Sequence, residues 1–539
     1  MSSYKLPSRN LVSQQDSAMI ERPDIPRSKF SGSWTRKTTF DAGYLVPFLL
    51  EEVLPGDHLK YDVTAFVRMA TPLFPIMDSQ RIDTFFFFVP NRLVWTNWKL
   101  FMGEVPNPTT TLPTNTVPVV GLSAGTLGAA NPCTLWDYFG MPVGNTAATL
   151  YPNAMPSRAY NLIYNEWFRD QNLINSVTVD TGDAVAGVSE DDASNYVLRK
   201  RAKSHDYFTS ALPWPQKFTA PAVALGGQAP IVGIGQLTNN NTDIGPVTAY
   251  DVNDGLADSY AITMPGTGGG GMVFDYGNVY ADLTSATGVS INVLRQAFLV
   301  QQLLERDARG GTRYTELVKS HFGVTSPDMR LQRPEYIGGG STPLTTTPIA
   351  QTAPVSGVGV GNLGGATTAA GQHRASYAAT EHGYIIGLIN VKTELSYSQG
   401  LPRHFRRSTR YDFYWPSLAG LGEQEILRSE IYCTGSGAND DVVFGYQERW
   451  HEYRTRTSEV TGYFRAKVTG NIDQWILAQE FSAAPTLGQT FIEDTPPMDR
   501  VLAASGLASG LQYYGDIHIR RQAVRPIPTF GTPVKLGGF

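Results

Sequence analysis

The sequence has very little cysteine and little charge for its length. Only Cys133 and Cys433 are present among 539 residues. A disulfide framework is therefore excluded, and both thiols are expected to be reduced. Charged residues make up 17 % of the chain, against about 25 % in typical soluble domains. Because a free monomer normally has a more charged surface, this deficit indicates that neighbouring subunits cover much of this chain.

Several functional classes lack their sequence signals. No apolar stretch reaches the roughly 18 residues of a membrane helix, and the first 24 residues have no apolar signal-peptide core. The eight histidines are scattered, so no metal site is predicted. Gly359, Gly361 and Gly364 fit G-x-G-x-x-G but lack the flanking strand and helix of a dinucleotide site. Since no carboxylate pair stands out either, we predict no catalytic constellation and no cofactor.

The longest local deficit is in residues 219–289. This segment has thirteen glycines and six aspartates but no Lys, Arg, His or Glu. A segment without cations is unsuited to line a cavity filled with DNA phosphates. Its short apolar runs, at 230–234, 260–264 and 272–276, indicate a small β-rich unit. If the protein forms a shell, we expect this unit to face outward.

Most of the remaining pattern favours β-structure. The sequence contains 53 Gly and 35 Pro, which suit many turns and long connections. Predicted strands cover residues 61–69, 82–89, 384–391, 411–415, 461–468, 475–481 and 512–519. The segment 82–89 is apolar on both faces, so it needs a second covering layer from an insertion or from another subunit. Its four rings are predicted to lie in the subunit core or in an assembly interface: Phe85, Phe86, Phe87 and Phe88.

Helices are few. Residues 291–306 show helical spacing of apolar residues after a capping Ser290, and residues 157–169 give a weaker signal. The segment 338–372 carries almost no charge and is predicted to be a flexible or extended connection. Residues 1–45 are predicted to be an extended N-terminal arm, because the first forty are polar, interrupted by proline and locally basic.

Basic residues gather in three places. Arginines beside aromatic rings suit single-stranded DNA, since guanidinium holds phosphate while rings stack on unpaired bases. The alternatives are salt bridges between subunits and simple solvation. A third group, near the C-terminus, consists of Arg520, Arg521 and Arg525. The predicted nucleic-acid-binding residues come from the first two groups: Arg403, Arg406, Arg407, Arg410, Arg449, Trp450, Arg454 and Arg456.

Long blocks of the sequence resemble a known family. They are DTFFFFVPNRLVW (83–95), residues 296–339, HGYIIGLINVKTELSYSQGL (382–401), TRYDFYWPSLAGLGEQ (409–424) and VFGYQERWHEYR (443–454). In this order they are similar to the major capsid proteins of gokushoviruses, within the microviruses. The resemblance implies an all-β viral jelly roll, an eight-stranded antiparallel sandwich with very large, partly helical loop insertions. Its core would begin in residues 46–218 and resume, after a surface insertion at 219–289, in residues 290–539.

The resemblance also implies a function. Identical subunits would assemble into the simplest icosahedral shell around a circular single-stranded DNA genome, with DNA on the inner face. The insertion at 219–289 would form threefold protrusions that meet a host receptor. A small basic DNA-packaging protein and a pilot protein are the other expected partners. The protein would be made and assembled in the host bacterial cytoplasm and reside in the virion. A carbohydrate-binding or carbohydrate-cleaving β protein is the alternative hypothesis.

Overall fold

A computed structural model describes most of the chain. It covers residues 25–104, 116–221, 291–352, 360–503 and 510–530, with short gaps at 124, 129–131, 145–148 and 184–190, and six short strands between 231 and 281. The chain divides into two compact units. The larger comprises residues 1–215 and 308–539, and the smaller comprises residues 216–307. Each unit is described by itself.

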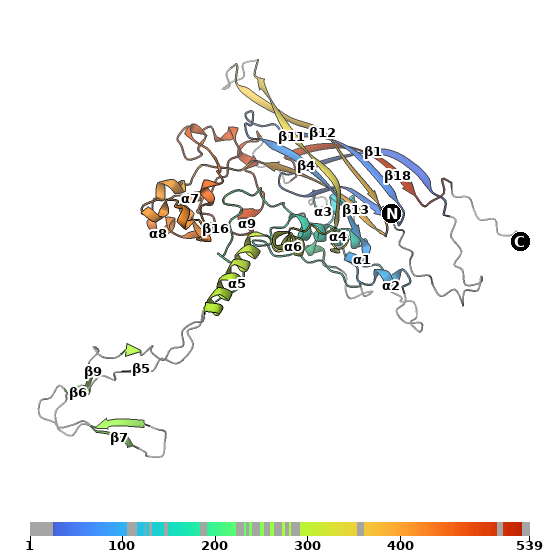
Figure 1. The fold of residues 1–539 in the computed structure, drawn as a ribbon. Helices are drawn as coiled ribbons and strands as arrows, with labels where there is room; N and C mark the ends of the chain where they lie inside the picture. Colours follow the sequence, from blue (N-terminus) through green and yellow to red (C-terminus); the bar gives the residue numbers. More distant parts are fainter. Residues whose placement is uncertain are drawn as a thin grey trace, which may run out of the picture. The chain divides into compact units, whose positions relative to one another are not determined.

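The larger unit is built on one eight-stranded antiparallel sheet (Figure 1). Its strands, in spatial order, are β1 (Ser28–Phe40), β18 (Tyr513–Arg525), β3 (His58–Met69), β12 (Leu363–Ala378), β11 (Glu335–Ala350), β4 (Gln80–Pro90), β13 (Gly383–Thr393) and β2 (Val46–Val53). Strands from both ends of the sequence are neighbours, and all eight are long. This barrel-like order confirms the predicted jelly-roll sandwich with helical insertions.

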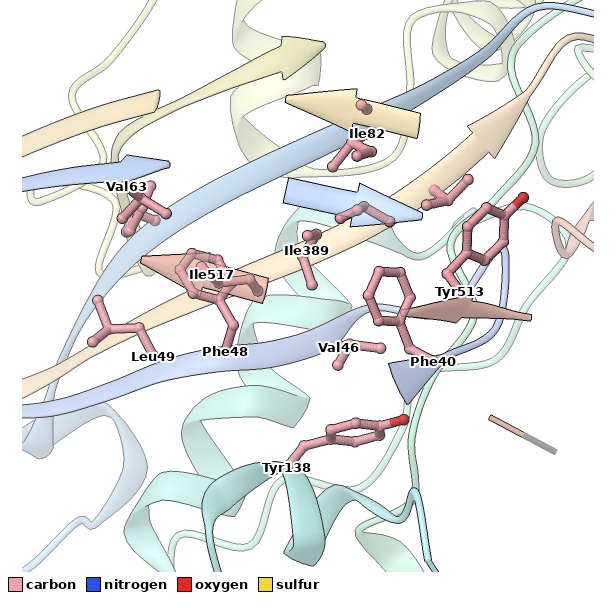
Figure 2. Close-up of a cluster of buried hydrophobic side chains, with 14 of the residues drawn as sticks. Phe40, Val46, Phe48, Leu49, Val63, Ile82, Tyr138, Ile389, Tyr513 and Ile517 are labelled. Carbon is pink, nitrogen blue, oxygen red and sulfur yellow. The ribbon is translucent and has the colours of Figure 1, made fainter. Parts of the chain in front are cut away.

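The sandwich interior is an apolar core between the two halves of the sheet (Figure 2). Strand β3 alternates strictly between buried and outward residues, as expected of a strand with one wet face. Its buried side meets side chains from β1, β4, β13 and β18. Fully buried members of the core include Phe40, Val63, Phe86, Ile389 and Ile517.

A second apolar layer covers the outer face of β4 and β13. All eleven residues of β13 are buried. The rings of Phe85 and Phe87 pack edge-on against Phe168, with centroids 5.0 and 5.7 Å apart. Phe86 and Phe88 point to the opposite side, into the sandwich core. The covering layer of the twin-faced strand is therefore the chain's own insertion, and the four phenylalanines lie within the subunit core.

The insertion that supplies this layer contains several short helices joined by irregular chain. Its tight packing depends on aromatic side chains such as Trp95, Trp136 and Tyr160, which join the outer-layer cluster. Its elements are α1 (Asn91–Val94), α2 (Trp98–Phe101), α3 (Leu135–Phe139), α4 (Met155–Ile163) and a π-helical turn at Tyr164–Phe168. The predicted helix at 157–169 is confirmed, with its last turn widened.

The rest of the larger unit is mainly short elements. They include α6 (Tyr314–Phe322), β14 (Ser396–Tyr397), β15 (Glu423–Leu427), α7 (Arg428–Ile431), α8 (Gly437–Asp440), β16 (Val443–Glu448), β17 (Ser458–Glu459) and α9 (Gln489–Ile492). Short 3-10 turns cover Ala193–Asn195, Arg403–Arg406, Arg410–Asp412, Pro416–Leu418, His451–Tyr453, Gly462–Phe464, Asp473–Trp475 and Met498–Arg500.

The smaller unit contains most of one long helix and the six short strands. The helix α5 (Ile291–Arg309) confirms the predicted one. The strands form three antiparallel pairs: β5 (Ile231–Val232) with β10 (Tyr280–Ala281), β6 (Leu237–Asn239) with β9 (Met272–Phe274), and β7 (Thr248–Val252) with β8 (Ser259–Thr263). These pairs agree with the predicted β-rich unit, although much of 219–289 lies outside the described residues.

Five predictions differ from the structure. Residues 411–415, 461–468 and 475–481 are not strands but 3-10 turns and irregular chain. Each sits outside the eight-stranded sheet, and the one strand contact among them is an isolated bridge from Gln479 to Tyr397 of β14. Within the predicted low-complexity connection, residues 338–350 and 363–372 belong to the paired strands β11 and β12. Within the predicted arm, residues 28–40 form β1, paired with β18 along its whole length; residues 1–24 lie outside the described chain.

Candidate nucleic-acid interface

The two predicted arginine clusters meet in space. Residues 403–410 occupy two 3-10 turns, and residues 449–456 follow strand β16. The Arg407 guanidinium lies over the Tyr453 ring, 4.5 Å from its centroid, and its Nη2 is 3.2 Å from Glu452 Oε1. Arg449 Nη2 donates to the Tyr411 carbonyl at 3.4 Å. Segments about 45 residues apart therefore form one surface.

Ion pairs neutralise four of the seven predicted arginines. Arg403 Nη1 lies 2.8 Å from Glu430 Oε1, and Arg407 pairs with Glu452. Arg406 pairs with Asp441 and Arg454 with Glu448. Burial raises the pKa of the Glu430 carboxyl, and the neighbouring Arg403 opposes that shift. These contacts hold the turns against neighbouring elements of the same chain, whereas the alternative considered from the sequence was salt bridges between subunits.

Trp450 is not available for base stacking. Its side chain is only 3 % exposed, and its indole N–H donates to the Leu418 carbonyl at 3.0 Å. The residue has a left-handed backbone, with φ of 68°, which turns the chain sharply after β16. Trp450 therefore packs beneath this surface, which corrects its predicted role in stacking on bases.

Three predicted arginines have no carboxylate partner among the described residues: Arg410, Arg449 and Arg456. The Arg410 guanidinium lies 4.8 Å from the Trp415 ring centroid, and that of Arg449 lies 4.5 Å from the Trp450 ring centroid. Cation–π contacts leave the positive charge in place while they fix the direction of the side chain. These arginines can therefore still bind phosphate.

Exposed aromatic rings surround these arginines. They are between 41 and 70 % exposed, which is high for such large apolar groups. The exposed rings are Phe405, Tyr411, Phe413, Tyr414, Trp415 and Tyr453. We call these rings, together with the three arginines Arg410, Arg449 and Arg456, the aromatic–arginine surface. Rings and guanidinium groups in this arrangement suit unpaired bases and their phosphates. Sequence reasoning missed the rings of 411–415 because it assigned that aromatic run to a strand.

The three C-terminal arginines make different contacts. Arg521 and Arg525 reach Glu51 on β2, and Tyr61 Oη donates to the same carboxylate at 2.5 Å. This shared contact ties strand β18 to the opposite half of the sandwich. Arg520 points the other way, onto an exposed face of the sheet. Nothing in the spacing of the three residues along the sequence separates these roles.

Among the described residues, no three His, Cys, Asp or Glu side chains gather closely enough to hold a metal ion. In the same part of the chain, no helix combines the length and apolar character needed to cross a membrane. Both cysteines are unpaired, Cys133 half-buried and Cys433 exposed.

Comparison with known proteins gives full-length matches. Residues 18–535 match the family model described as capsid protein (F protein). A capsid protein VP1 of Bdellovibrio phage phiMH2K is 41 % identical, over 99 % of this chain and 100 % of the relative. The VP1 proteins of Chlamydia phage 1 and Spiroplasma virus 4 are 38 and 32 % identical, over 98 and 96 % of this chain and 98 and 97 % of the relatives.

Proposed function

This chain belongs to the phage capsid protein (F protein) family, and from that premise we propose that identical copies of it assemble into a closed icosahedral shell around a circular single-stranded DNA genome. The family membership makes it a capsid protein of a microvirus-like phage, and a structural protein rather than an enzyme. The observation that carries the proposal is the likeness to capsid proteins over nearly the whole chain. The carbohydrate-cleaving alternative has no comparable support.

Self-assembly has support in the composition of the surface. The chain has few charges for its size. Charged groups other than arginine are depleted where subunits meet, so this deficit fits a surface that neighbouring copies cover. In a closed symmetric shell each subunit makes several contacts at once, so individually weak contacts suffice.

Electron microscopy tests the assembly directly. The full-length protein is expressed in bacteria, and particles are separated by sedimentation. We expect uniform closed particles that contain nuclease-protected single-stranded DNA when a phage genome is supplied. A protein that stays monomeric under all these conditions would contradict the proposal.

Contact with the genome is assigned to the aromatic–arginine surface. The triple variant R410Q/R449Q/R456Q removes three charges that have no carboxylate partner among the described residues. We expect particles that form but protect less DNA. The matched control, K99Q/K319Q/R330Q, removes three exposed cations elsewhere and leaves the protected DNA unchanged. Equal DNA content in both sets of particles would remove this surface from the proposal.

Attachment to the host is assigned to residues 219–289, which lack cations altogether. Deletion of residues 225–285 should give particles that form but do not adsorb to cells. The control is a deletion of equal length replaced by a Gly/Ser linker, which separates loss of the segment from a strained junction. Adsorption that survives both deletions would contradict the assignment.

Two further partners are expected from the resemblance to gokushovirus capsid proteins, and the charge balance supports the first. The whole chain has a net charge of -5, so it cannot neutralise a genome alone. We therefore expect a small, strongly basic packaging protein inside the shell, together with a pilot protein for DNA delivery. Particles are expected to assemble in the bacterial cytoplasm, where these partners are made.

A further inference from the structure

In the part of the chain that the structure describes, one half of the sandwich has an outer face with exposed side chains. Strands β1, β18, β3 and β12 lie side by side (Figure 1). In β3, β12 and the first part of β18, every second residue is buried in the core and the residues between them point outward. The helical insertion covers the other half, over β4 and β13. We call the outward side of these four strands the open face.

The open face is strongly basic. Six lysine and arginine side chains point outward from it, against two aspartates: Lys29, Lys37, Lys60, Arg68, Arg374 and Arg520, with Asp62 and Asp516. The whole chain is net negative, so positive charge is concentrated here. Among the described residues, only Arg374 of these six has a carboxylate within 4.0 Å, with its Nε 3.6 Å from Asp62 Oδ2.

Strand register arranges these charges in successive rows. Arg520 lies opposite Asp62, which lies opposite Arg374. The next rows toward one end contain His518 and then Lys37, and the last contains Arg68. Toward the other end the rows contain Lys60 and then Lys29. Rows are about 6.6 Å apart, because each uses every second residue of a strand. A polyanion laid along the strands would meet a lysine or arginine in each of these rows except that of His518.

A hollow of about 610 Å³ opens at the Arg68 end of the face. Lys37, Arg68, Phe66 and Tyr514 line it, together with Asp516. The Arg68 guanidinium lies 5.0 Å from the Phe66 ring centroid, and the Tyr514 ring is 43 % exposed. Rings beside guanidinium groups suit unpaired bases. The hollow therefore offers a place for a base beside the rows of phosphate-binding cations.

The chemistry of the face favours a nucleic acid over a second copy of this chain. The centres of subunit interfaces are apolar and depleted of lysine, whereas this face is polar and holds three lysines. We propose that the open face binds single-stranded DNA through its phosphates, with a base held between Tyr514 and Phe66. The inference rests on the proposed function, in that a shell around single-stranded DNA supplies the ligand.

The test uses assembled particles of the full chain. The face variant is K37Q/K60Q/R68Q/R520Q, and the matched control is K99Q/K319Q/R330Q/K467Q, which removes four exposed cations elsewhere. Genomes containing 5-iododeoxyuridine are packaged, cross-linked with light and mapped by mass spectrometry. We expect a DNA adduct on Tyr514 in wild-type and control particles. The face variant should lose most of that adduct and protect at least about twofold less DNA.

Unassembled full-length protein gives an independent measurement. A fluorescent dT oligonucleotide is titrated by anisotropy at several salt concentrations. Each phosphate contact on a single strand contributes about 0.7 to the slope of log affinity against log salt. The face variant should therefore lower that slope by about 2 to 3 and weaken binding more than tenfold at low salt. The control should match the wild type.

Three outcomes would overturn the inference, and they have different consequences for the proposed function. In the first, the face variant and the wild type have equal salt-dependence slopes, and DNA adducts form only on the aromatic–arginine surface. That result would remove the open face as a DNA site but keep the shell function. A face variant that cannot form particles, while its control does, would make the face a contact between copies. Wild-type particles without DNA would remove the proposed function and this inference together.

Discussion

Arg158 and Asp191 form a two-pronged ion pair inside the helical insertion. Arg158 Nε donates to Asp191 Oδ2 at 2.7 Å, and Nη2 donates to Oδ1 at 2.6 Å. The arginine is fully buried. Its remaining N–H groups reach the carbonyls of Val94 and Gly182, each at 3.0 Å. The pair thus joins helix α4 to the chain on either side of it.

Substitution of Asp191 should destabilise the subunit. Asp191→Asn leaves the Arg158 charge buried without a counter-ion, which costs about 3–5 kcal/mol. The measurement is the free energy of unfolding from urea titration. Lys467→Gln is the control, because its pair with Glu480 is exposed and is worth about 0–1 kcal/mol. Equal effects of the two substitutions would contradict the structural role of the buried pair.

Substitutions on the two faces of β4 should lower the free energy of unfolding by similar amounts. Phe86→Ala opens a cavity in the sandwich core and Phe87→Ala opens one beneath the insertion, each at a cost of about 3–5 kcal/mol. Phe86→Asp and Phe87→Asp should give aggregate or monomer and no particles. Phe405→Ala changes a ring that is 70 % exposed and should leave unfolding unaffected. Normal particles from both Asp variants would refute the covered-strand interpretation.

His373 should make stability depend on pH. Its two ring nitrogens are 2.7 Å from Thr84 Oγ1 and 2.9 Å from Thr342 Oγ1. Burial lowers its pKa below the ordinary value of 6.5, against the opposing effect of Asp83. The unfolded chain therefore binds this proton at higher pH than the folded chain does. The contribution of His373 to the free energy of unfolding is fully present above pH 6.5. It is lost as the pH falls through the pKa of His373 in the folded chain.

The variant His373→Gln isolates this effect. We expect the unfolding midpoint of the wild type to fall more between pH 7 and pH 5 than that of the variant. His58→Gln, on an exposed position of β3, should keep the wild-type slope. If His373→Gln retains the full pH dependence, another group is responsible.

Arg403 and Arg410 should behave differently although they are close in sequence. Arg403→Gln leaves the Glu430 carboxylate, whose side chain is 2 % exposed, without its cation and should cost about 3–5 kcal/mol. Arg410→Gln alters an exposed side chain without a carboxylate partner among the described residues, so its effect on stability should stay within about 0.5 kcal/mol. Thermal unfolding of the two variants separates a structural arginine from one available to a ligand.

The sequence predicts the sheet best where one face of a strand is wet. The strands predicted at 61–69 and 512–519 are confirmed, and the structure extends them to His58–Met69 and Tyr513–Arg525. The apolar run in 82–89 correctly indicates a strand that needs two covering layers. The resemblance to gokushovirus capsid proteins correctly gives the family and the jelly roll.

Other features depend on contacts that no local pattern records. Residues 461–468 alternate as cleanly as a strand but meet no neighbouring strand, and they form turns instead. The glycine- and threonine-rich β11 and β12 look like a linker, yet β12 is paired by β3 from far along the chain. Likewise, the sequence lists arginines and acids, but only the fold shows that Arg403 meets Glu430 and that Arg410 meets none among the described residues.

The unequal covering of the two half-sheets constrains how this lineage can vary. A change in β13 must suit the sandwich core on one side and the helical insertion on the other, because all its residues are buried. Replacements there are expected to arise in coordinated sets that include Trp136 or Phe168. The outward side chains of β3 do not enter the core, so these positions affect core packing only through their backbone. A replacement there leaves the packing of the subunit intact and acts instead on the charge of the open face.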